Sequence, residues 1–285
     1  MFPRGVYDSP ILCVIIIGKR KAGFESSTIG RIMERIIQQF DPITLDEMSG
    51  IRLMNRIDTK FVTTMPVLAR LLVMAQEEYM AQEINGERNM LYETTYFDTT
   101  RYDMFYTHQY GYANRQKLRF RTYVASDLQF LEVKTKNNHG RTKKKRMQVT
   151  DMQIDDALQM AFIDKHLRYG HQGLMPALQN RFRRLTLVNK ARTERLTIDT
   201  DLEFHNLVTG TDRRMWPLVI VELKRDGLCF SPVLEMLRVL RVFPHGFSKY
   251  CMGSALTNDQ LRVNRFKPKL IDIRKIANES NSFVL

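Results

Sequence analysis

The chain has 285 residues, of which 44% are hydrophobic, so it can bury a core in one large domain or two small ones. Its 44 lysines and arginines against 31 acidic residues give a formal net charge of +13 at pH 7. That excess favours acidic partners, such as nucleic acid, anionic lipid or phosphorylated ligands, without choosing among them. The composition is otherwise that of an ordinary globular protein.

The spacing of cysteine and histidine argues against two common kinds of site. Cys13, Cys229 and Cys251 are scattered and form no CxxC pair, which disfavours both a disulfide framework and a zinc ribbon and favours a reducing cytoplasm. The six histidines show no HExxH or HxH spacing. A metal would therefore need carboxylates and phosphate oxygens.

Residues 1–26 are interpreted as a poorly determined N-terminal extension. Their apolar run, Ile11 to Ile17, is far shorter than the roughly 20 residues that span a bilayer. The basic residues follow this run, whereas a signal peptide carries them in front.

Hydrophobic spacing and turn residues predict the elements that come next. In chain order they are a helix over 27–39 capped near Ser27, a turn at Asp41-Pro42 with a short helix over 44–53, a strand over 56–62, a helix over 65–82, a strand over 91–98 and a tyrosine-rich segment over 102–112. The tyrosine-rich segment is expected to form barrel wall rather than a platform for stacking nucleobases.

Between Arg115 and Arg146, charged side chains, nearly all cationic, occupy every second position of strand-like runs. Because alternate residues of a strand point to one face, this spacing lines a single surface with charge and leaves the other face apolar. Asn137 to Gly140 is a strong turn signal, so residues 129–149 are predicted to form a hairpin. A row of cations this dense repels itself unless a polyanion lies beside it, so phosphate chains are the first candidate ligand.

The remaining elements are predicted in the same way. They are helices over 154–167 and 174–179, strands over 182–188, 195–202 and 218–224, and a helix over 231–240. No Pro/Gly-rich linker separates two domains, so a single domain is expected over 27–268, followed by a C-terminal tail over 269–285.

The apolar phase of each strand must bury against helices, which makes the opposite phase the inner one. By this test Lys143 and Lys145 point outward and Lys144 and Arg146 inward. The inner phase of the other strands is polar or charged, with Phe182 and the carboxylates of Asp58, Glu132, Asp199 and Glu222 among many cations. An ordinary core is never built this way. The pattern predicts an α+β fold in which an antiparallel β-barrel forms a hydrated, cationic tunnel with flanking helices.

Seven short motifs, in this order, resemble the VTC domain family. They are Arg56-x-Asp58-x-Lys60-Phe61, Tyr96-Phe97-Asp98-Thr99, Lys117-x-Arg119-x-Arg121-x-Tyr123, Glu132-Val133-Lys134, Ile198-Asp199-Thr200-Asp201-Leu202, Val221-Glu222-Leu223-Lys224 and Phe247-Ser248-Lys249-Tyr250. The family comprises the catalytic part of the vacuolar transporter chaperone polyphosphate polymerase and its bacterial relatives, within the triphosphate tunnel metalloenzymes. Each motif alone is unspecific, and seven in order is a strong signal.

The resemblance implies a polyphosphate polymerase that moves the γ-phosphate of ATP onto a growing polyphosphate chain with a divalent metal, Mn²⁺ or Mg²⁺. The residues that would act on the phosphates as catalytic groups are Lys60, Arg119, Arg121, Lys134, Arg184 and Lys249. Further phosphate contacts are expected from Arg56, Lys117, Lys136, Lys144, Arg146, Arg195, Lys224 and Ser248. The metal would be held by Glu222, with Glu132 and Asp199 as the additional candidates.

Two positions depart from the family patterns. Arg56-x-Asp58-x-Lys60 stands in place of the ExExK signature of CYTH phosphatases, which removes carboxylates from a metal-binding position and disfavours hydrolysis by that scheme. Phe182 stands where the fungal polymerase has a tyrosine, so one hydroxyl facing the phosphates is missing.

Two other functions stay open at this point. One is a triphosphate or nucleotide hydrolase or cyclase in the same tunnel, and the other is a sensor that binds polyphosphate without turnover. The expected partners are ATP and polyphosphate, with no specific nucleic acid, because the charges point inward. The expected location is the cytoplasm, and a membrane-protein partner at the inner face of the membrane and the oligomeric state are left open.

Overall fold

A computed structural model of the chain describes residues 22–49, 51, 56–139 and 141–282. One sheet organises it, and each strand along the main path is antiparallel to its neighbours. In spatial order these strands are β2 (Arg56–Thr64), β11 (Leu218–Asp226), β9 (Glu194–Asn206), β8 (Leu174–Asn189), β4 (Asn89–Thr99), β5 (Arg115–Tyr123), β6 (Leu128–Lys136) and β7 (Thr142–Val149). Three short strands lie off this path: β1 (Asp41–Ile43), β3 (Tyr79–Gln82) and β10 (Asp212–Arg214).

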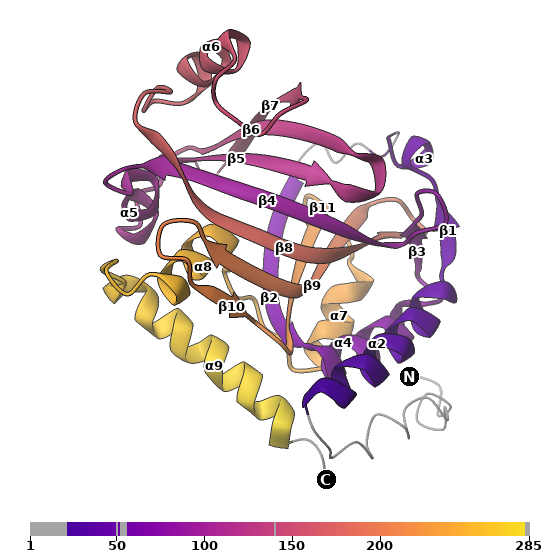
Figure 1. Cartoon of the computed structure of the whole chain (residues 1–285). Coiled ribbons are helices and arrows are strands. Elements are labelled where there is room, and N and C mark those ends of the chain that lie inside the picture. Colours follow the sequence, from indigo (N-terminus) through magenta and orange to yellow (C-terminus); the bar gives the residue numbers. More distant parts are fainter. Residues whose placement is uncertain (1–21, 50, 52–55, 140, 283–285) are drawn as a thin grey trace.

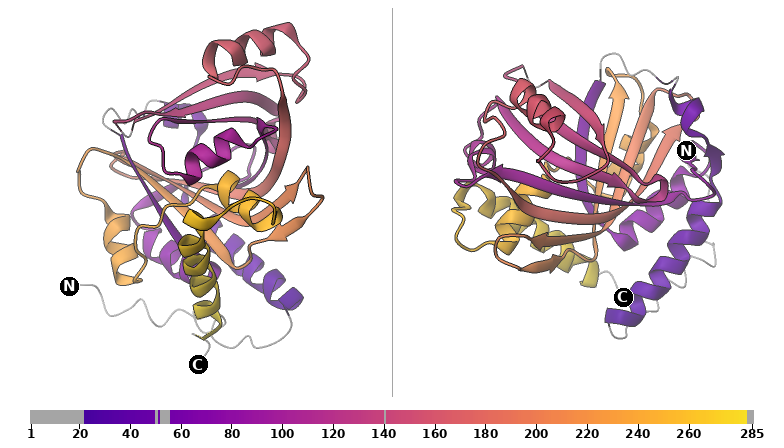
Figure 2. Two further views of the ribbon diagram at one scale, coloured as in Figure 1. Left: turned by 90° about the vertical axis from the view of Figure 1, so that its left-hand side faces the viewer. Right: turned by 45° about the horizontal axis from the view of Figure 1, so that its top comes forward.

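The sheet curls around an interior, as the two views of Figure 2 show. The predicted α+β class with a curled antiparallel sheet is therefore confirmed. Within the described residues the two end strands, β2 and β7, do not pair with each other, so the barrel is open along this side. Part of the free edge of β2 is covered, because Pro244 bridges to Phe61 and the His245 N–H donates to the Lys60 carbonyl at 2.7 Å.

Helices cover the outer face of the sheet, where the apolar phase of each strand is buried (Figure 1). The helices α2 (Ala22–Gln38), α4 (Met65–Ala75) and α7 (Pro232–Val239) belong to one core with β2, β11, β9 and β8. Leu185, Ile198 and Val221 are the kind of alternating strand residue that this core buries. Because these residues are fixed outward, their neighbours in sequence are fixed inward.

Of two further cores, one lies on the outer face and the other on the inner face of the sheet. Helix α6 (Ala157–His166) buries Ile163 against the outward residues of β5 and β6, including Phe120 and Val133. Residues of α5 (Asp103–Gln109), α8 (Lys249–Thr257) and α9 (Lys267–Ser282) share the other core with β4, β8 and β9. Helix α8 approaches the sheet closely, since a Cβ on Gly253 would lie 2.4 Å from the Phe204 ring.

The short helix expected after Asp41-Pro42 is α3 (Leu45–Ser49), and its start carries a capping box. The Thr44 N–H donates to a Glu47 carboxylate oxygen at 2.8 Å, and the Glu47 N–H donates to the Thr44 hydroxyl at 3.3 Å. The rest of that predicted helix, at residues 50 and 52–55, lies outside the described residues, as does most of the predicted extension over 1–26.

Several predicted boundaries were wrong. Residues 174–179 begin strand β8 rather than a helix, and the helix predicted over 65–82 ends at Ala75, after which β3 follows. Both errors arise from short apolar runs, for which periodicity does not separate strand from helix. Helix α2 begins at Ala22 rather than near Ser27, and the predicted tail contains helix α9.

The tyrosine-rich segment is helix α5 rather than barrel wall, and residues at the end of β4 cap its start. The Asp98 carboxylate accepts hydrogen bonds from the Met104 and Phe105 N–H groups, each at 2.9 Å, and the Thr99 hydroxyl accepts one from the Asp103 N–H at 3.1 Å. Tyr102, directly before the helix, makes no side-chain cap, so the usual N-cap signal is missing from the sequence. Among the described residues, no helix is both long and apolar enough to cross a bilayer.

Candidate functional site

The inward faces of the strands bring cations together around three carboxylates, and each carboxylate is shared by two cations. Glu222 on β11 lies opposite Lys60 on β2 in the strand register. The Lys60 ammonium donates to one Glu222 oxygen, and Lys224 donates to the other at 2.6 Å. Burial alone would raise the pKa of Glu222, but Lys224 and Lys60 hold it far below its usual range. This carboxylate is therefore ionised and fixes two ammonium groups.

Glu132 forms the second such bridge, across β5, β6 and β7. It is fully buried, and its two oxygens lie 2.7 Å from the Arg119 guanidinium and 3.1 Å from the Lys144 ammonium. Burial opposes ionisation, yet Arg119, Arg121 and Lys144 lower the pKa of Glu132 to about 2. Lys144 reaches the interior from an exposed position, which agrees with its predicted inward phase.

Asp199 forms the third bridge, between β8 and helix α8. Arg184 grips it with two hydrogen bonds, at 2.6 Å from Nε and 2.8 Å from Nη2, and Lys249 donates to one of the same oxygens. Burial would raise the pKa of Asp199, but Arg184 and Lys249 lower it well below its usual range. A bidentate guanidinium pair of this kind fixes geometry as well as charge.

An aromatic stack adjoins this third bridge. Phe182 is fully buried, and its ring stacks on Tyr92 with centroids 5.5 Å apart and planes at 16°. The Lys249 ammonium lies 4.2 Å from the Phe182 centroid, and the guanidinium carbons of Arg184 and Arg121 lie 5.2 Å and 5.9 Å from it. Cations from β5, β8 and α8 thus gather around the Phe182 ring, an arrangement that cation–π attraction favours. Phe182 points inward as predicted.

Other inward cations have no carboxylate partner within the described residues. Arg121 is 7% exposed, and its one hydrogen bond is from Nε to the Thr94 hydroxyl at 3.4 Å. Lys134 lies opposite Lys117 on β5 and Lys144 on β7, and forms no ion pair. Burial, with Arg119, Lys60 and Lys117, lowers the pKa of Lys134 to about 7. Arg121 is buried and Lys134 half-buried, and unpaired cations in such surroundings favour an anionic ligand.

A groove of about 1060 Å³ continues from these residues to the surface. Its lining includes Lys60, Lys117, Lys134, Lys136, Glu222 and Ser248. Lys117 donates to the Ser248 hydroxyl at 2.7 Å, and Ser248 also caps helix α8. Of the predicted phosphate contacts, Arg56, Lys117, Lys136 and Ser248 thus share one continuous space with Lys60, Lys134 and Glu222.

Three of the predicted residues lie at the margin of this arrangement. Arg56 is exposed, pairs with Asp58 at 2.7 Å and lines the groove. Arg146 is exposed too, with its guanidinium carbon 4.8 Å from the centre of the Phe130 ring. Arg195 lies opposite Lys224 in the strand register, and its buried Nε has no hydrogen-bond partner.

Sequence reasoning missed several residues of the site. Tyr92 and Thr94 share the inward phase of β4 and could have been found by the alternation used for the other strands. Lys143, predicted to point outward, lines the groove, because it lies at the end of β7 beside the turn. Lys269 of α9 also lines it, although no sequence pattern linked the C-terminal residues to the site.

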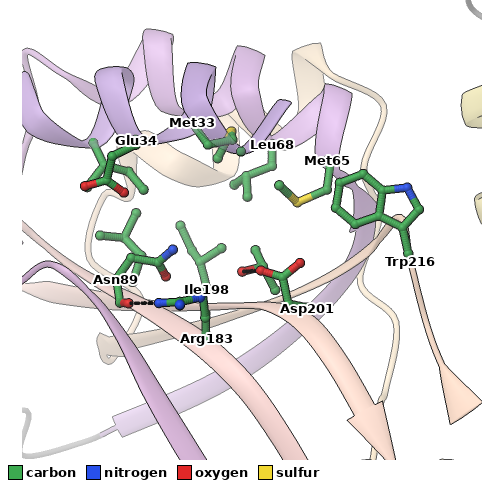
Figure 3. A pocket seen from close by; sticks show the side chains of 13 residues that line it. Met33, Glu34, Met65, Leu68, Asn89, Arg183, Ile198, Asp201 and Trp216 are labelled. Carbon is green, nitrogen blue, oxygen red and sulfur yellow. Dashed lines mark hydrogen bonds between the residues drawn. The ribbon is translucent and has the colours of Figure 1, made fainter. Parts of the chain in front are cut away.

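A smaller cavity of about 330 Å³ lies on the opposite face of the sheet, beneath α2 and α4 (Figure 3). Its walls include Met33, Met65 and Trp216, and Arg183 donates there to the Asn89 carbonyl at 3.2 Å. No residue predicted for the phosphate site lines it. The chemistry of the interior is therefore separate from this cavity.

The carboxylates fit only one mode of metal binding. Among the described residues, no three histidine, cysteine, aspartate or glutamate side chains gather as a metal cage. Glu222, Glu132 and Asp199 each already hold two cations. The donor set thus suits a divalent ion that takes one carboxylate oxygen and otherwise water and phosphate oxygens, as Mg²⁺ often does.

Comparison with known proteins adds three distant structural similarities. A candidate adenylyl cyclase from Hippeastrum, reported to have a dominant triphosphatase activity, is 16% identical with a TM-score of 0.45, over 71% of this chain and 96% of that one. A candidate adenylate cyclase from Vibrio parahaemolyticus is 11% identical with a TM-score of 0.42, over 70% and 99%. The S. pombe RNA triphosphatase Pct1 is 7% identical with a TM-score of 0.28, over 92% and 98%.

These similarities are low in identity and in TM-score, so no assignment rests on them. No curated protein matches the chain. The model of the VTC domain matches residues 55–258, which include every predicted site residue. The chain therefore belongs to the VTC domain family.

Proposed function

We propose that this chain is a polyphosphate polymerase, which transfers the γ-phosphate of ATP to the end of a growing polyphosphate chain. The observation that carries the proposal is the convergence of cations from separate strands, with Arg121 buried, Lys134 half-buried, and both without a carboxylate partner among the described residues. The VTC family membership supports the same substrate class.

The reaction asks the protein mainly to align donor and acceptor and to offset the charge of the transferring group. An oxygen of the terminal phosphate of the chain forms a bond to the γ-phosphorus, the bond from that phosphorus to the β–γ bridging oxygen breaks, and ADP leaves. The acceptor oxygen is already ionised near neutral pH, so no general base is needed. A site of lysines and arginines suffices for this chemistry.

The role proposed for each residue follows from its contacts. Arg119, Arg184 and Lys249 are fixed by carboxylates and hold phosphates in a set geometry. Arg121 and Lys134 offset the charge on the transferring group. Lys60 and Lys224 would turn from Glu222 to phosphate oxygens as substrate enters.

A divalent ion, Mn²⁺ or Mg²⁺, would be held by one oxygen of Glu222 once a lysine has left it. When bound, it would supply further positive charge to the phosphate oxygens. Glu132 and Asp199 would keep their arginine partners and serve as counter-charges to the cations.

Incubation of the whole chain with ATP and Mn²⁺ or Mg²⁺, followed by separation of the products, tests the proposal. We expect polyphosphate and ADP, with the rate reduced at least about 100-fold in Lys134→Ala and in Arg121→Ala. Lys165→Ala, at an exposed position on α6, is the control and should match the wild type.

Two other results would replace the proposal. Orthophosphate as the sole phosphate product would make the chain a triphosphate hydrolase. Tight binding of polyphosphate with no consumption of ATP would make it a sensor.

A further inference from the structure

Three tyrosines form a row at the C-terminal end of helix α5. Tyr106 and Tyr110 stack with ring centroids 5.9 Å apart and planes at 21°, and Tyr110 meets Tyr112 edge to face at 6.3 Å. Tyr110 is 48% exposed and Tyr112 is 61% exposed, whereas Tyr106 is half-buried. None of the three lines the groove of the phosphate site.

The way in which the helix ends places the last of these rings. Gly111 has φ +80°, and its N–H donates to the His108 carbonyl at 3.1 Å. The Tyr112 N–H donates to the Thr107 carbonyl at 3.2 Å. This pair of hydrogen bonds is the Schellman motif, which turns the chain directly after a helix. Tyr112 is therefore turned back beside Tyr110.

Buried rings support the row from below. Tyr106 packs edge to face on Phe105 at 5.3 Å, and Phe105 packs in the same way on Phe266 at 5.7 Å. Phe105 is fully buried and Phe266 is 4% exposed. Phe266 ends the short helix η2 (Asn264–Phe266), so this contact joins α5 to the segment that leads into α9. Both lie on the same side of the molecule in Figure 1.

That segment brings cations to the tyrosines. Arg262, Arg265 and Lys267 are exposed. The Arg265 guanidinium donates to the Tyr110 carbonyl, and the Arg262 N–H donates to the Tyr106 hydroxyl at 3.4 Å. Within the described ranges, none of these three cations forms an ion pair with a carboxylate. Their positive charge is therefore not compensated within that part of the protein.

Exposed rings beside unpaired cations indicate single-stranded nucleic acid as the ligand. Proteins bind single strands by stacking bases on aromatic side chains while cations follow the phosphate backbone. A ligand made of phosphate alone would leave the rings unused, and an apolar partner would leave the cations unused. Over residues 258–267, three cations stand against one carboxylate, Asp259, so the local charge favours a polyanion.

The alternation of strand residues led to the opposite expectation, that no specific nucleic acid is bound. That reasoning covers strands alone, whose charges point inward. The three cations here follow the last strand of the chain, β11, and the tyrosines lie on a helix and in the turn after it. Strand alternation therefore does not apply to this surface.

We infer that Tyr110 and Tyr112, together with Arg262, Arg265 and Lys267, form a surface that binds single-stranded nucleic acid, by stacking bases on the two rings and by contacts from the cations to the phosphates. No residue of this surface lines the groove, so it is a second binding site. The inference does not depend on the proposed function, because base stacking at these tyrosines requires no phosphate transfer.

The test compares labelled oligomers of thymidine, of uridine and of an abasic backbone with the same charge, each about 12 nucleotides long. Fluorescence anisotropy measures their affinity for the whole chain. The wild type should bind the two base-containing oligomers at least about tenfold more tightly than the abasic oligomer. A preference for uridine or for thymidine would support the inference and would identify RNA or DNA as the ligand.

The first pair of variants removes the rings. Tyr110→Ala with Tyr112→Ala should lose the preference for bases and change the affinity for the abasic oligomer less than about twofold. Tyr110→Phe with Tyr112→Phe keeps both rings and should keep the preference. The control is Phe230→Ala with Phe243→Ala, which removes rings that are 76% and 70% exposed on either side of α7 and should behave as the wild type.

The second pair of variants removes charge. Arg262→Ala with Lys267→Ala should make the slope of log affinity against log salt about 1.4 smaller for every oligomer. Arg265 is left in place because it holds the Tyr110 carbonyl. The control is Arg31→Ala with Arg35→Ala, two exposed positions on α2, and its slope should match that of the wild type.

Equal affinity of the wild type for all three oligomers would overturn the inference, because the rings would then contribute nothing. Equal effects of a variant and its control would overturn it too, since the binding would reflect only the overall charge and surface of the protein. Melting temperatures show whether each variant is folded. If the double tyrosine variant is not, Tyr112→Ala alone, at the more exposed ring, should still lose part of the preference for bases, and an unchanged preference would overturn the inference.

Discussion

The ammonium group of Lys249 lies 4.2 Å from the centre of the Phe182 ring and at the same time pairs with the Asp199 carboxylate. The two residues are far apart in the chain, one on β8 and the other at the start of α8. Since Arg184 and Arg121 also face this ring, Phe182 sets the relative position of three cations of the site. A fully buried apolar residue thereby organises a polar interior.

Phe182→Leu should therefore weaken phosphate binding as well as stability. Cation–π attraction at a desolvated site is worth up to about 2 kcal/mol for one cation, so we expect a loss of roughly tenfold to thirtyfold in affinity for tripolyphosphate. Calorimetry measures this change. Phe120→Leu is the matched control, because Phe120 is equally buried but lies on the outward face of β5.

Both leucine variants should lower the melting temperature, since each loses buried ring area. If Phe120→Leu weakened binding as much as Phe182→Leu, the effect would come from general loosening and not from the ring. Phe182→Tyr keeps the ring and should retain most of the affinity.

The pKa of Lys134, lowered to about 7, predicts that phosphate binding weakens as the pH rises. A bound phosphate favours the charged ammonium, so the pKa of Lys134 is higher in the complex than in the free protein. Affinity should be greatest below about pH 7 and should then fall by up to about tenfold per pH unit until the pKa of the complex is passed. Binding near pH 7 to 8 should take up a proton, which calorimetry in buffers of different ionisation enthalpy detects.

Lys134→Arg is the variant that tests this assignment, because arginine stays charged throughout this range. Its affinity should depend less on pH. The pH dependence that remains should centre near pH 8, because burial and Arg184 lower the pKa of Lys249 to about 8, although Asp199 acts to raise it. An unchanged pH profile in Lys134→Arg would show that another group titrates.

Much of the site follows from alternation in the sequence. When the apolar residues of a strand are buried on one face, the residues between them must point to the other face. This reasoning placed Arg119, Glu132, Lys134, Arg184 and Glu222 in one interior, and the structure brings these side chains together there. It also gave the hairpin of β6 and β7. Such inferences are local, since they need only the two-residue period and the position of buried neighbours.

Features that depend on distant partners could not be read in this way. Lys269 reaches the groove only because α9 packs along β2. The pairing of each carboxylate with two cations depends on strand register and curl, which a single sequence does not specify. The outward assignment of Lys143 failed because strand alternation loses its meaning at the end of a strand beside a turn.

Glu222→Gln separates the proposed role in metal binding from a role as a counter-charge. The amide keeps the shape but loses the charge, and a divalent ion binds an amide oxygen less strongly than a carboxylate. We expect the concentration of Mn²⁺ that gives half-maximal activity to rise by about tenfold or more. Affinity for tripolyphosphate without metal should rise, since the interior becomes more positive.

Glu132→Gln is the companion variant for this experiment. It removes the partner of Arg119 and Lys144, so it should alter phosphate binding and stability without changing the metal dependence. If both variants shifted the metal dependence equally, Glu222 would not be the particular ligand that we propose.

A substitution at Gly253 tests the packing of helix α8 on the sheet. The position of Lys249 depends on this packing. A Cβ at this residue would lie 2.4 Å from the Phe204 ring and 2.6 Å from a methyl group of Leu178, both in a tightly packed core. Gly253→Ala should therefore force α8 away from β8 and β9 and lower the free energy of unfolding by about 1–3 kcal/mol, measured by denaturant titration. Gly30→Ala on α2, where no atom lies within 4 Å of the added carbon, is the control and should be neutral or stabilising by up to about 1 kcal/mol.

Because Lys249 is the first residue of α8, the fraction of Gly253→Ala that stays folded should also bind tripolyphosphate more weakly. Full affinity in that fraction would mean that the start of the helix is held independently of its packing on the sheet.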